Sequence, residues 1–113
     1  MGNKKDNQYY IRKIVTDLDF ILKHTCGLTQ TEIEENELLI DSIMFRLIQI
    51  SENADKLTDE FKKQTSVPWR AVKGLRNRIV HEYGNVDLTV VYDTVTIDLP
   101  ELYCELKGIN ENL

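Results

Sequence analysis

One short stretch of the sequence, residues 74–87, gathers the side chains best suited to chemistry. It reads GLRNRIVHEYGNVD and holds Arg76, Asn77 and His81 close together, with Tyr83 two residues further on. Guanidinium groups bind phosphate oxygens bidentately and stay charged at neutral pH. Because an imidazole can accept or donate a proton near neutrality, this combination predicts chemistry on a phosphodiester.

The helix expected around this stretch places its polar residues on one side. Pro68 suits the first turn of a helix that would continue to Gly84 and Asn85. At 100° per residue, one polar stripe contains Arg70, Lys73, Asn77 and His81, with Arg76 on its border beside the core. Asn77 and His81 are spaced i,i+4 and are expected to touch. Arg78 falls on the outer face, where an ordinary surface residue is expected.

Together these groups fit transphosphorylation of RNA, in which the 2′-OH is the nucleophile and no metal has to activate water. Arg76 and its neighbours would hold the charge that develops on phosphorus. In-line cleavage generally needs a base and an acid, yet the motif supplies one histidine, because His24 lies in the first expected helix. A twofold dimer would supply a second imidazole, so dimerisation is expected to be part of the mechanism.

Other interpretations of the stretch stay open. A lone histidine on a helix is more often a surface residue than a catalytic one, and Tyr83 also suits a place at the rim of the core. The basic stripe could equally belong to a non-catalytic module that docks a nucleotide or an acidic protein. No Gly-rich phosphate loop, HExxH or Gly-x-Ser-x-Gly motif occurs. Cys26 and Cys104 are too few for a zinc site, so no metal or cofactor is expected.

Length and patterning predict a single all-α domain over residues 1–113. The chain is 42% hydrophobic and 29% charged, and at this length roughly two-thirds of the unfolded surface can be buried. Apolar residues recur with a helical period nearly throughout. In the longest expected helix Ile40, Leu47 and Ala54 repeat every seven residues, which is typical of lengthwise packing. These features predict an antiparallel bundle of four to five helices.

Helix boundaries follow from capping residues. Gly27 should stop the first helix. Thr29 with Glu32 and Thr31 with Glu34 both match a capping box that would open a long second helix, and a break or kink is expected at Thr58 or Asp59. Asp87 can cap a last helix that is rich in β-branched residues but keeps a 3.6-residue period through a kink or break at Pro100. A second side of the long helix carries Leu38, Phe45 and Ile48, which predict either a further core contact or a dimer surface.

Charge is distributed unevenly along the chain. The net charge is −5, yet residues 61–81 contain six of the 14 basic residues and no Asp or Glu. The remainder has 8 basic and 19 acidic residues, or −11. This contrast favours either a local positive field or a solvated basic helix face. No run approaches the ~20 apolar residues of a membrane helix, and the N-terminal residues lack the apolar stretch of a signal peptide, so a cytoplasmic protein is expected.

At these residues the chain resembles a known family. RNRIVHEY is similar to the Arg-x4-His-x-Tyr motif of HEPN-domain toxins of the HepT type. Most of the chain takes part in the resemblance, because ISENADKLTDEF and VPWRAVKGLRNRIVHEYGNVD follow each other in the family's order and DLPEL lies near the end. The combination of Pro-Trp, Gly-Leu-Arg-Asn, the histidine and the tyrosine makes the resemblance fairly specific.

The resemblance implies a HEPN-like homodimer that acts as a metal-independent endoribonuclease toxin of a type VII (HepT/MntA-like) toxin–antitoxin system, with RNA as its substrate. Arg76 and His81 would match the catalytic pair, supported by Asn77. The implied partner is a minimal nucleotidyltransferase antitoxin, which would transfer AMP onto Tyr83. Adenylyl phosphate beside the arginine and histidine would occupy the RNA phosphate site with negative charge and bulk. The alternative is a non-catalytic helical module that binds a nucleotide or a protein and partners a nucleotidyltransferase.

Overall fold

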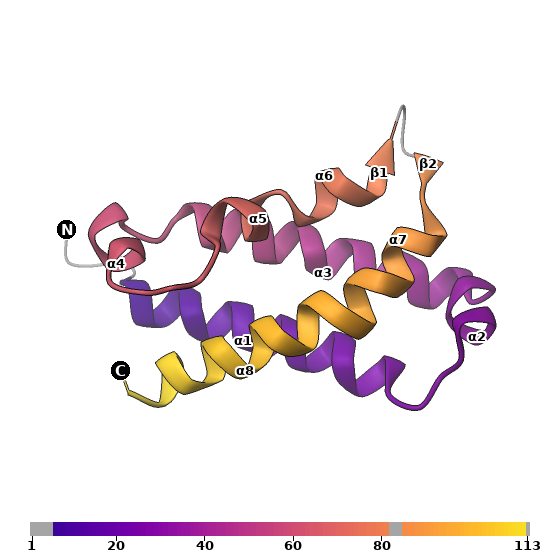
Figure 1. Ribbon diagram of the computed structural model, residues 1–113, viewed down its shortest axis with the longest axis horizontal. Coiled ribbons are helices and arrows are strands. Elements are labelled where there is room, and N and C mark those ends of the chain that lie inside the picture. Colours follow the sequence, from indigo (N-terminus) through magenta and orange to yellow (C-terminus); the bar gives the residue numbers. More distant parts are fainter. Residues whose placement is uncertain (1–5, 82–84, 113) are drawn as a thin grey trace.

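The structure is a computed structural model that describes residues 6–81 and 85–112, with the backbone alone at His81 (Figure 1). Its elements, in chain order, are α1 (Asn7–Thr25), α2 (Gln30–Glu34), α3 (Glu37–Asp55), α4 (Asp59–Lys63), α5 (Trp69–Lys73), α6 (Leu75–Ile79), β1 (Val80–His81), β2 (Asn85–Val86), α7 (Leu88–Asp93), the π-helical segment η2 (Thr94–Asp98) and α8 (Leu99–Glu111). The expectation of an all-α fold is confirmed, apart from the two-residue strands.

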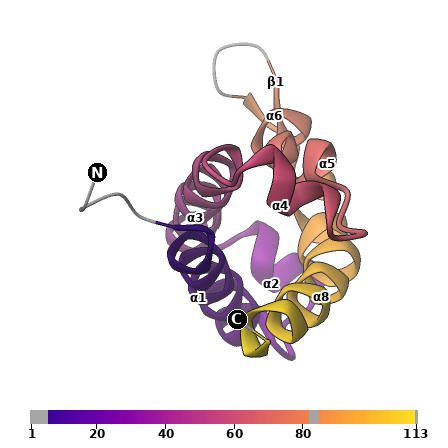
Figure 2. The ribbon, with the colours of Figure 1, turned by 90° about the vertical axis from the view of Figure 1, so that its left-hand side faces the viewer.

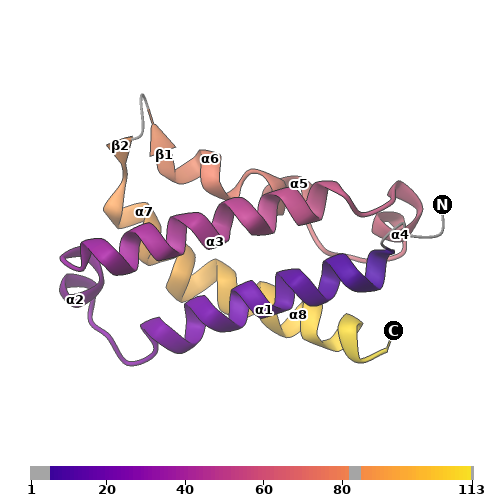
Figure 3. The same cartoon turned by 180° about the vertical axis from the view of Figure 1, so that it is seen from behind.

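Four arms of alternating direction form the bundle: α1, then α3, then α5 with α6, and finally the continuous helix made by α7, η2 and α8 (Figures 1 and 3). Viewed end-on, α1, α3, α5 and α8 surround the interior, while β1 projects from one side (Figure 2). The arms are therefore antiparallel, as the sequence predicts, although short helices at the corners make the helix count higher than four to five.

The core consists of the apolar stripes that the sequence indicates. The buried hydrophobic residues are Ile11, Ile14, Leu18, Ile21, Ile33, Ile40, Ile43, Leu47, Ile50, Ala54, Leu57, Val67, Trp69, Val72, Leu75, Ile79, Val91, Val95, Leu99, Leu102 and Leu106. Every arm contributes to this cluster, so the seven-residue repeat of α3 packs lengthwise as expected. Cys26 and Cys104 are exposed free thiols.

The second expected helix is divided into two. Thr29 does form the capping box, since its hydroxyl accepts from the Glu32 N–H (3.1 Å) and the Glu32 carboxylate accepts from the Thr29 N–H (2.8 Å). This box opens only the short α2, because Asn36 leaves the helical conformation and caps α3 by accepting from the Leu39 N–H (3.0 Å). The break expected near Thr58 is present, with the Thr58 side chain capping α4.

The last arm is helical despite its β-branched residues. Asp87 caps it as expected by accepting from the Val90 N–H at 3.2 Å. The helix continues through Pro100 without breaking, because the π-helical segment η2 precedes the proline and the Leu99 N–H donates to the Thr94 carbonyl five residues back. A π-helical turn of this kind re-routes the hydrogen bonds just before the residue that lacks an N–H.

The arm that carries the candidate site differs most from the expected helix. It breaks at Gly74, which separates α5 from α6, and it ends at Ile79 rather than at Gly84. Val80 adopts extended backbone angles and pairs with Val86 in the antiparallel β1–β2 ladder. Two β-branched residues facing each other favour such a ladder, and it turns the chain back toward α7. The wheel that placed Asn77 and His81 one helical turn apart is therefore wrong.

Candidate active site

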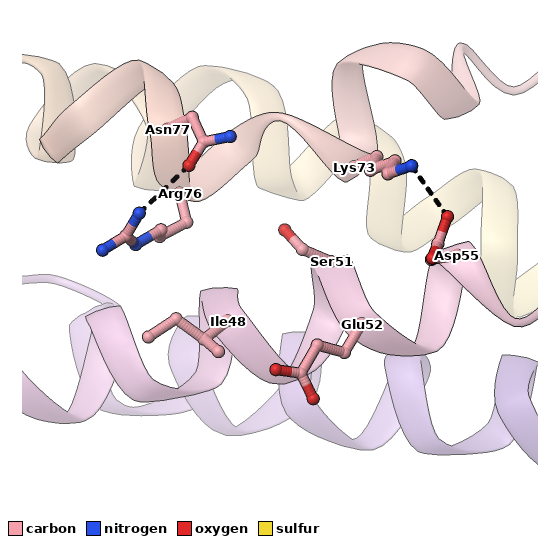
Figure 4. Close-up of a pocket in the computed structure, with 7 residues that line it drawn as sticks. All are labelled: Ile48, Ser51, Glu52, Asp55, Lys73, Arg76 and Asn77. Atoms are coloured by element: carbon pink, nitrogen blue, oxygen red, sulfur yellow. Dashed lines mark hydrogen bonds and ion pairs between the residues drawn. The ribbon is translucent and has the colours of Figure 1, made fainter.

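A groove runs between α3 and the α5–α6 arm. It encloses about 400 Å³ and is lined by Ile48, Ser51, Glu52 and Asp55 from α3 and by Lys73, Arg76 and Asn77 from the other arm (Figure 4). The structure therefore brings three of the sequence-predicted site residues together in one concave surface. The α5–α6 arm is held against the rest of the bundle by Val72, Leu75 and Ile79, whose side chains are buried in the core.

Lys73 forms an ion pair with Asp55 across the groove. The ammonium nitrogen lies 2.8 Å from Asp55 Oδ1, and both side chains are more than half exposed. The hydrogen bond from Lys73, reinforced by its charge, lowers the pKa of Asp55 below the ordinary value of an aspartate, and the charge of Lys62 adds to the effect. At neutral pH this carboxylate therefore remains ionised and competes with any phosphate for the lysine.

Arg76 and Asn77 are neighbours in contact with each other. The Arg76 guanidinium donates to the Asn77 side-chain oxygen at 3.1 Å, and both residues are exposed. Within residues 6–81 and 85–112, Arg76 has no carboxylate within ion-pair distance. No carboxylate of the described residues therefore has to be displaced before the remaining N–H donors of Arg76 reach an incoming anion.

The groove as a whole is not strongly basic. Glu52 and Asp55 of α3 line the same groove as Lys73 and Arg76, so that among its described lining residues two negative side chains balance two positive ones. The acid-free character of residues 61–81 suggested a local positive field, but the fold places acidic residues of another helix opposite that segment. Sequence reasoning missed Glu52 and Asp55 because only the packing of α3 against α5 and α6 brings them to the groove.

The other expected site residues either lie outside the groove or have side chains outside the part of the chain that the structure describes. Arg70 is exposed on α5 and does not line the groove. The backbone of His81 is the second residue of β1, paired with Asn85, whereas its side chain lies outside what the structure describes, as does all of Tyr83. Among the described residues, no group of three or more His, Cys, Asp or Glu side chains is arranged to hold a metal ion.

Arg78 differs from the ordinary surface residue that the sequence predicts. Its Nη2 donates to Thr94 Oγ1 at 3.0 Å and to Asp98 Oδ2 at 2.5 Å, which joins α6 to η2. Thr94 is fully buried and Asp98 is partly exposed. The sequence contains no signal for this contact, because it depends on how the last arm crosses α6.

Comparison with known proteins identifies the family. The family model for HepT-like ribonucleases matches residues 14–109, which is most of the chain. The chain belongs to the HepT-like ribonuclease family. It is 27% identical to a protein of Caldanaerobacter subterraneus named "Putative RNase", over 88% of this chain and 90% of that one. It is 28% identical to the "Probable ribonuclease HepT" of Thermococcus cleftensis, over 97% of each chain. No solved structure matches it.

Membership of this family confirms the resemblance drawn from the motif and indicates ribonuclease activity. The match includes both walls of the groove, since α3, α5, α6 and β1 all fall within residues 14–109. In the part of the chain that the structure describes, no helix is both long and apolar enough to cross a bilayer.

Proposed function

We propose that this protein is a metal-independent endoribonuclease that acts as the toxin of a type VII toxin–antitoxin system. The observation that carries the proposal is the groove of a HepT-like ribonuclease chain, in which Lys73, Arg76 and Asn77 lie together just before the strand that contains His81. Arginine and histidine at one phosphate site suit cleavage by the 2′-hydroxyl of the RNA itself.

In the proposed reaction the 2′-oxygen loses its proton to a base and attacks phosphorus, while the bond to the 5′-oxygen breaks and that oxygen takes up a proton. The products are a 2′,3′-cyclic phosphate and a free 5′-hydroxyl. His81 transfers protons, and Arg76 stabilises the extra negative charge on the phosphoryl oxygens in the transition state. Asn77 accepts a hydrogen bond from Arg76 at 3.1 Å, which holds the guanidinium for this task.

Dimerisation completes the proposed site. The outer face of α3 exposes Leu38 (78%) and Phe45 (58%), and Ile48, on the same helix, also lines the groove. Exposed apolar side chains that continue into a site indicate an interaction surface. A second copy packed on this face around a twofold axis would cover them and bring its own Arg76 and His81 to the same substrate.

Neutralisation is proposed to act on Tyr83. This residue follows His81 by two positions in the sequence, and a nucleotidyltransferase antitoxin would transfer AMP from ATP to its hydroxyl. The added phosphate would bring negative charge next to the residues that bind the RNA phosphate. The mass of the purified protein tests this step directly, because each AMP adds a defined mass that must map to Tyr83.

The cleavage assay uses unmodified protein and a labelled single-stranded RNA in the presence of EDTA. We expect cleavage with 2′,3′-cyclic phosphate ends, and loss of cleavage by at least about 100-fold in His81→Ala and Arg76→Ala. Circular dichroism spectra of both variants should match that of the wild-type protein, which shows that they are folded. Intact RNA after incubation with unmodified, dimeric wild-type protein would overturn the proposal.

The balanced charge of the groove favours one alternative, a non-catalytic module that binds a nucleotide or a protein. Glu52 and Asp55 would then pair with basic groups of a partner, while Lys73 and Arg76 bind its acidic groups. In that case variants of Arg76 and His81 would lose binding to the nucleotidyltransferase, and no preparation would cleave RNA.

A further inference from the structure

The Arg78 bridge, meaning the two hydrogen bonds from Arg78 to Thr94 and Asp98, lies outside the groove yet holds one of its walls. A single nitrogen, Nη2, makes both contacts. The acceptor Thr94 is fully buried, so its hydroxyl depends on partners within the protein. The Arg78 and Asp98 side chains are 49% and 42% exposed, so the buried Thr94 hydroxyl is what distinguishes the bridge from an isolated surface ion pair, which contributes little to structure.

The helix that the bridge holds cannot keep its orientation alone. α6 has five residues and no side-chain cap at its N-terminus, and isolated helices of this length are unstable in water. Leu75 and Ile79 are buried beneath it. Their burial fixes which face of α6 points inward, and the Asp87 N–H donates to the Ile79 carbonyl (3.0 Å) at the end of the helix. The Arg78 bridge adds a directional side-chain contact on the flank of α6.

The residues that need a fixed orientation are exposed ones. Arg76 and Asn77 line the groove, and among the described residues the side-chain hydrogen bond of Arg76 is to its neighbour Asn77, so α6 sets the direction of both. β1 starts directly after Ile79, so the backbone of His81 also follows the orientation of α6. A small rotation of α6 would therefore move every motif residue together.

The partner segment is well suited to hold α6. η2 is part of one continuous helix with α7 and α8, whose residues Val91, Val95 and Leu99 are buried in the core. Thr94 and Asp98 are four residues apart on this helix and reach Arg78 together. The bridge thus ties α6 to the last arm, whereas the groove itself opens toward α3.

We propose that Arg78 is a positioning residue: through Thr94 and Asp98 it fixes the orientation of α6 and hence of Arg76, Asn77 and the strand that contains His81. The inference rests on the proposed ribonuclease function. Arg78 acts through other residues and has no direct part in proton transfer or phosphate binding. Its removal should therefore lower the rate of the chemical step while RNA binding is retained.

The kinetic test compares Arg78→Gln and Asp98→Asn with wild type in steady-state cleavage of RNA. We expect kcat to fall about 10- to 100-fold with KM changed less than about threefold, because misplacement by an ångström costs rates of that order. Arg78→Lys should recover most of the rate, since one nitrogen makes both contacts. Glu101→Gln is the matched control, because it removes an exposed charge from α8 near Asp98, and it should behave as wild type.

Coupling and hydrogen exchange complete the test. The double variant Arg78→Gln/Asp98→Asn should be no slower than Arg78→Gln alone. Amide exchange in residues 75–81 should accelerate in both single variants, while exchange in α1 stays unchanged. Asp98→Asn keeps the Thr94 contact, so it reports on the bridge even if Arg78→Gln does not fold.

The outcomes separate the inference from the proposed function. If wild-type protein does not cleave RNA, the proposed function fails, and accelerated exchange confined to residues 75–81 still supports the bridge. If folded Arg78→Gln and Asp98→Asn keep the wild-type kcat and the wild-type exchange of residues 75–81, the positioning role is overturned. A rise in KM with kcat unchanged would also overturn it, because Arg78 would then contribute to binding.

Discussion

In the proposed site, Lys73 is the residue whose availability would determine how strongly the groove binds a phosphate. It is paired with Asp55 at 2.8 Å, and its hydrogen bond lowers the pKa of that carboxyl, so the pair persists at neutral pH and is lost only as the pH falls through the lowered pKa. At the proposed site an RNA phosphate would therefore have to displace the Asp55 carboxylate before it could bind this cation. Arg76, by contrast, donates to a neutral amide oxygen.

Asp55→Asn is predicted to strengthen RNA binding. The substitution releases Lys73, so the Kd for a single-stranded RNA should fall about two- to fivefold, in the range of an exposed ion pair. The slope of log K against log salt should steepen by about 0.7, the value for one further phosphate contact. Fluorescence anisotropy with an uncleavable 2′-O-methyl RNA measures both. Asp93→Asn, an exposed aspartate on α7, should leave both unchanged, and equal effects of the two variants would contradict the prediction.

Asp17 is a buried carboxylate that depends on one arginine. Arg46 donates to Asp17 Oδ1 at 2.7 Å and lies 3.9 Å from the centre of the Phe20 ring, while Asp17 Oδ2 is buried with no hydrogen-bond partner among the described residues. Burying an unpaired charge is costly, so Arg46→Met should lower the free energy of unfolding by about 2–3 kcal/mol.

Urea unfolding at fixed protein concentration measures this loss. The double variant Asp17→Leu/Arg46→Met should recover at least half of it, because the carboxylate is then absent as well. If the double variant is as unstable as Arg46→Met, or less stable, the loss comes from packing against Phe20 rather than from the unpaired charge.

Among the elements, the start of α3 depends on a residue that the helical period does not reveal. Asn36 caps α3 through its side-chain oxygen at 3.0 Å from the Leu39 nitrogen. Asn36→Ala should lower the free energy of unfolding by about 1 kcal/mol, while Asn36→Asp should keep most of the stability. Urea unfolding of both variants makes the comparison, and equal stability of Asn36→Ala and wild type would contradict the role of the cap.

The sequence predicts the arms better than it predicts the segment with the motif. Ile40, Leu47 and Ala54 are buried as their seven-residue spacing indicates, because periodic burial along one helix is a local property. The end of α6 at Ile79 depends on pairing between Val80 and Val86, which are six residues apart, and a helical period does not reveal such pairing. The motif residues therefore do not form the predicted stripe on a single helix, because Asn77 lies on α6 and His81 on β1.

In the groove, too, the residues from one local segment are predictable from the sequence, whereas those brought in by packing between arms are not. Lys73, Arg76 and Asn77 are predicted from one local segment and do line it, whereas Glu52 and Asp55 reach it from a helix about 20 residues earlier in the chain. Arg70 belongs to the predicted stripe and lies on α5 with Lys73, but it is one turn earlier in the helix and does not line the groove. Contacts between arms, such as that of Arg78 with Asp98, require the fold itself.

At the scale of the whole molecule, the exposed face of α3 is the predicted dimer surface. Leu38→Glu and Phe45→Glu should each convert the dimer to a folded monomer and abolish RNA cleavage, because charged groups in an apolar interface are costly to bury. Sedimentation velocity measures whether each variant is a monomer, and circular dichroism measures whether it is folded. Ile97→Glu is the matched control, since Ile97 is 63% exposed but lies on η2, and it should leave the dimer intact.

A folded Phe45→Glu monomer with full activity would show that the site needs no second copy. A dimer that persists in both α3 variants would place the interface elsewhere. Either result would require the single motif histidine to work with another proton-transfer group of the same chain.

The π-helical turn of η2 also limits which insertions and deletions the chain can tolerate. Such a turn contains one residue more than an α-helical turn, and η2 sits between Val91 and Leu102, both buried. Deleting a single residue there would restore regular α-helical winding and leave Leu102 and Leu106 facing the core, because the wider turn accommodates the extra residue. Deleting one residue from the regular helix between Leu102 and Leu106 would instead rotate everything beyond it by about 100° and turn Leu106 away from the core. Among homologous sequences, a one-residue gap within residues 94–98 should therefore be tolerated better than one within α8.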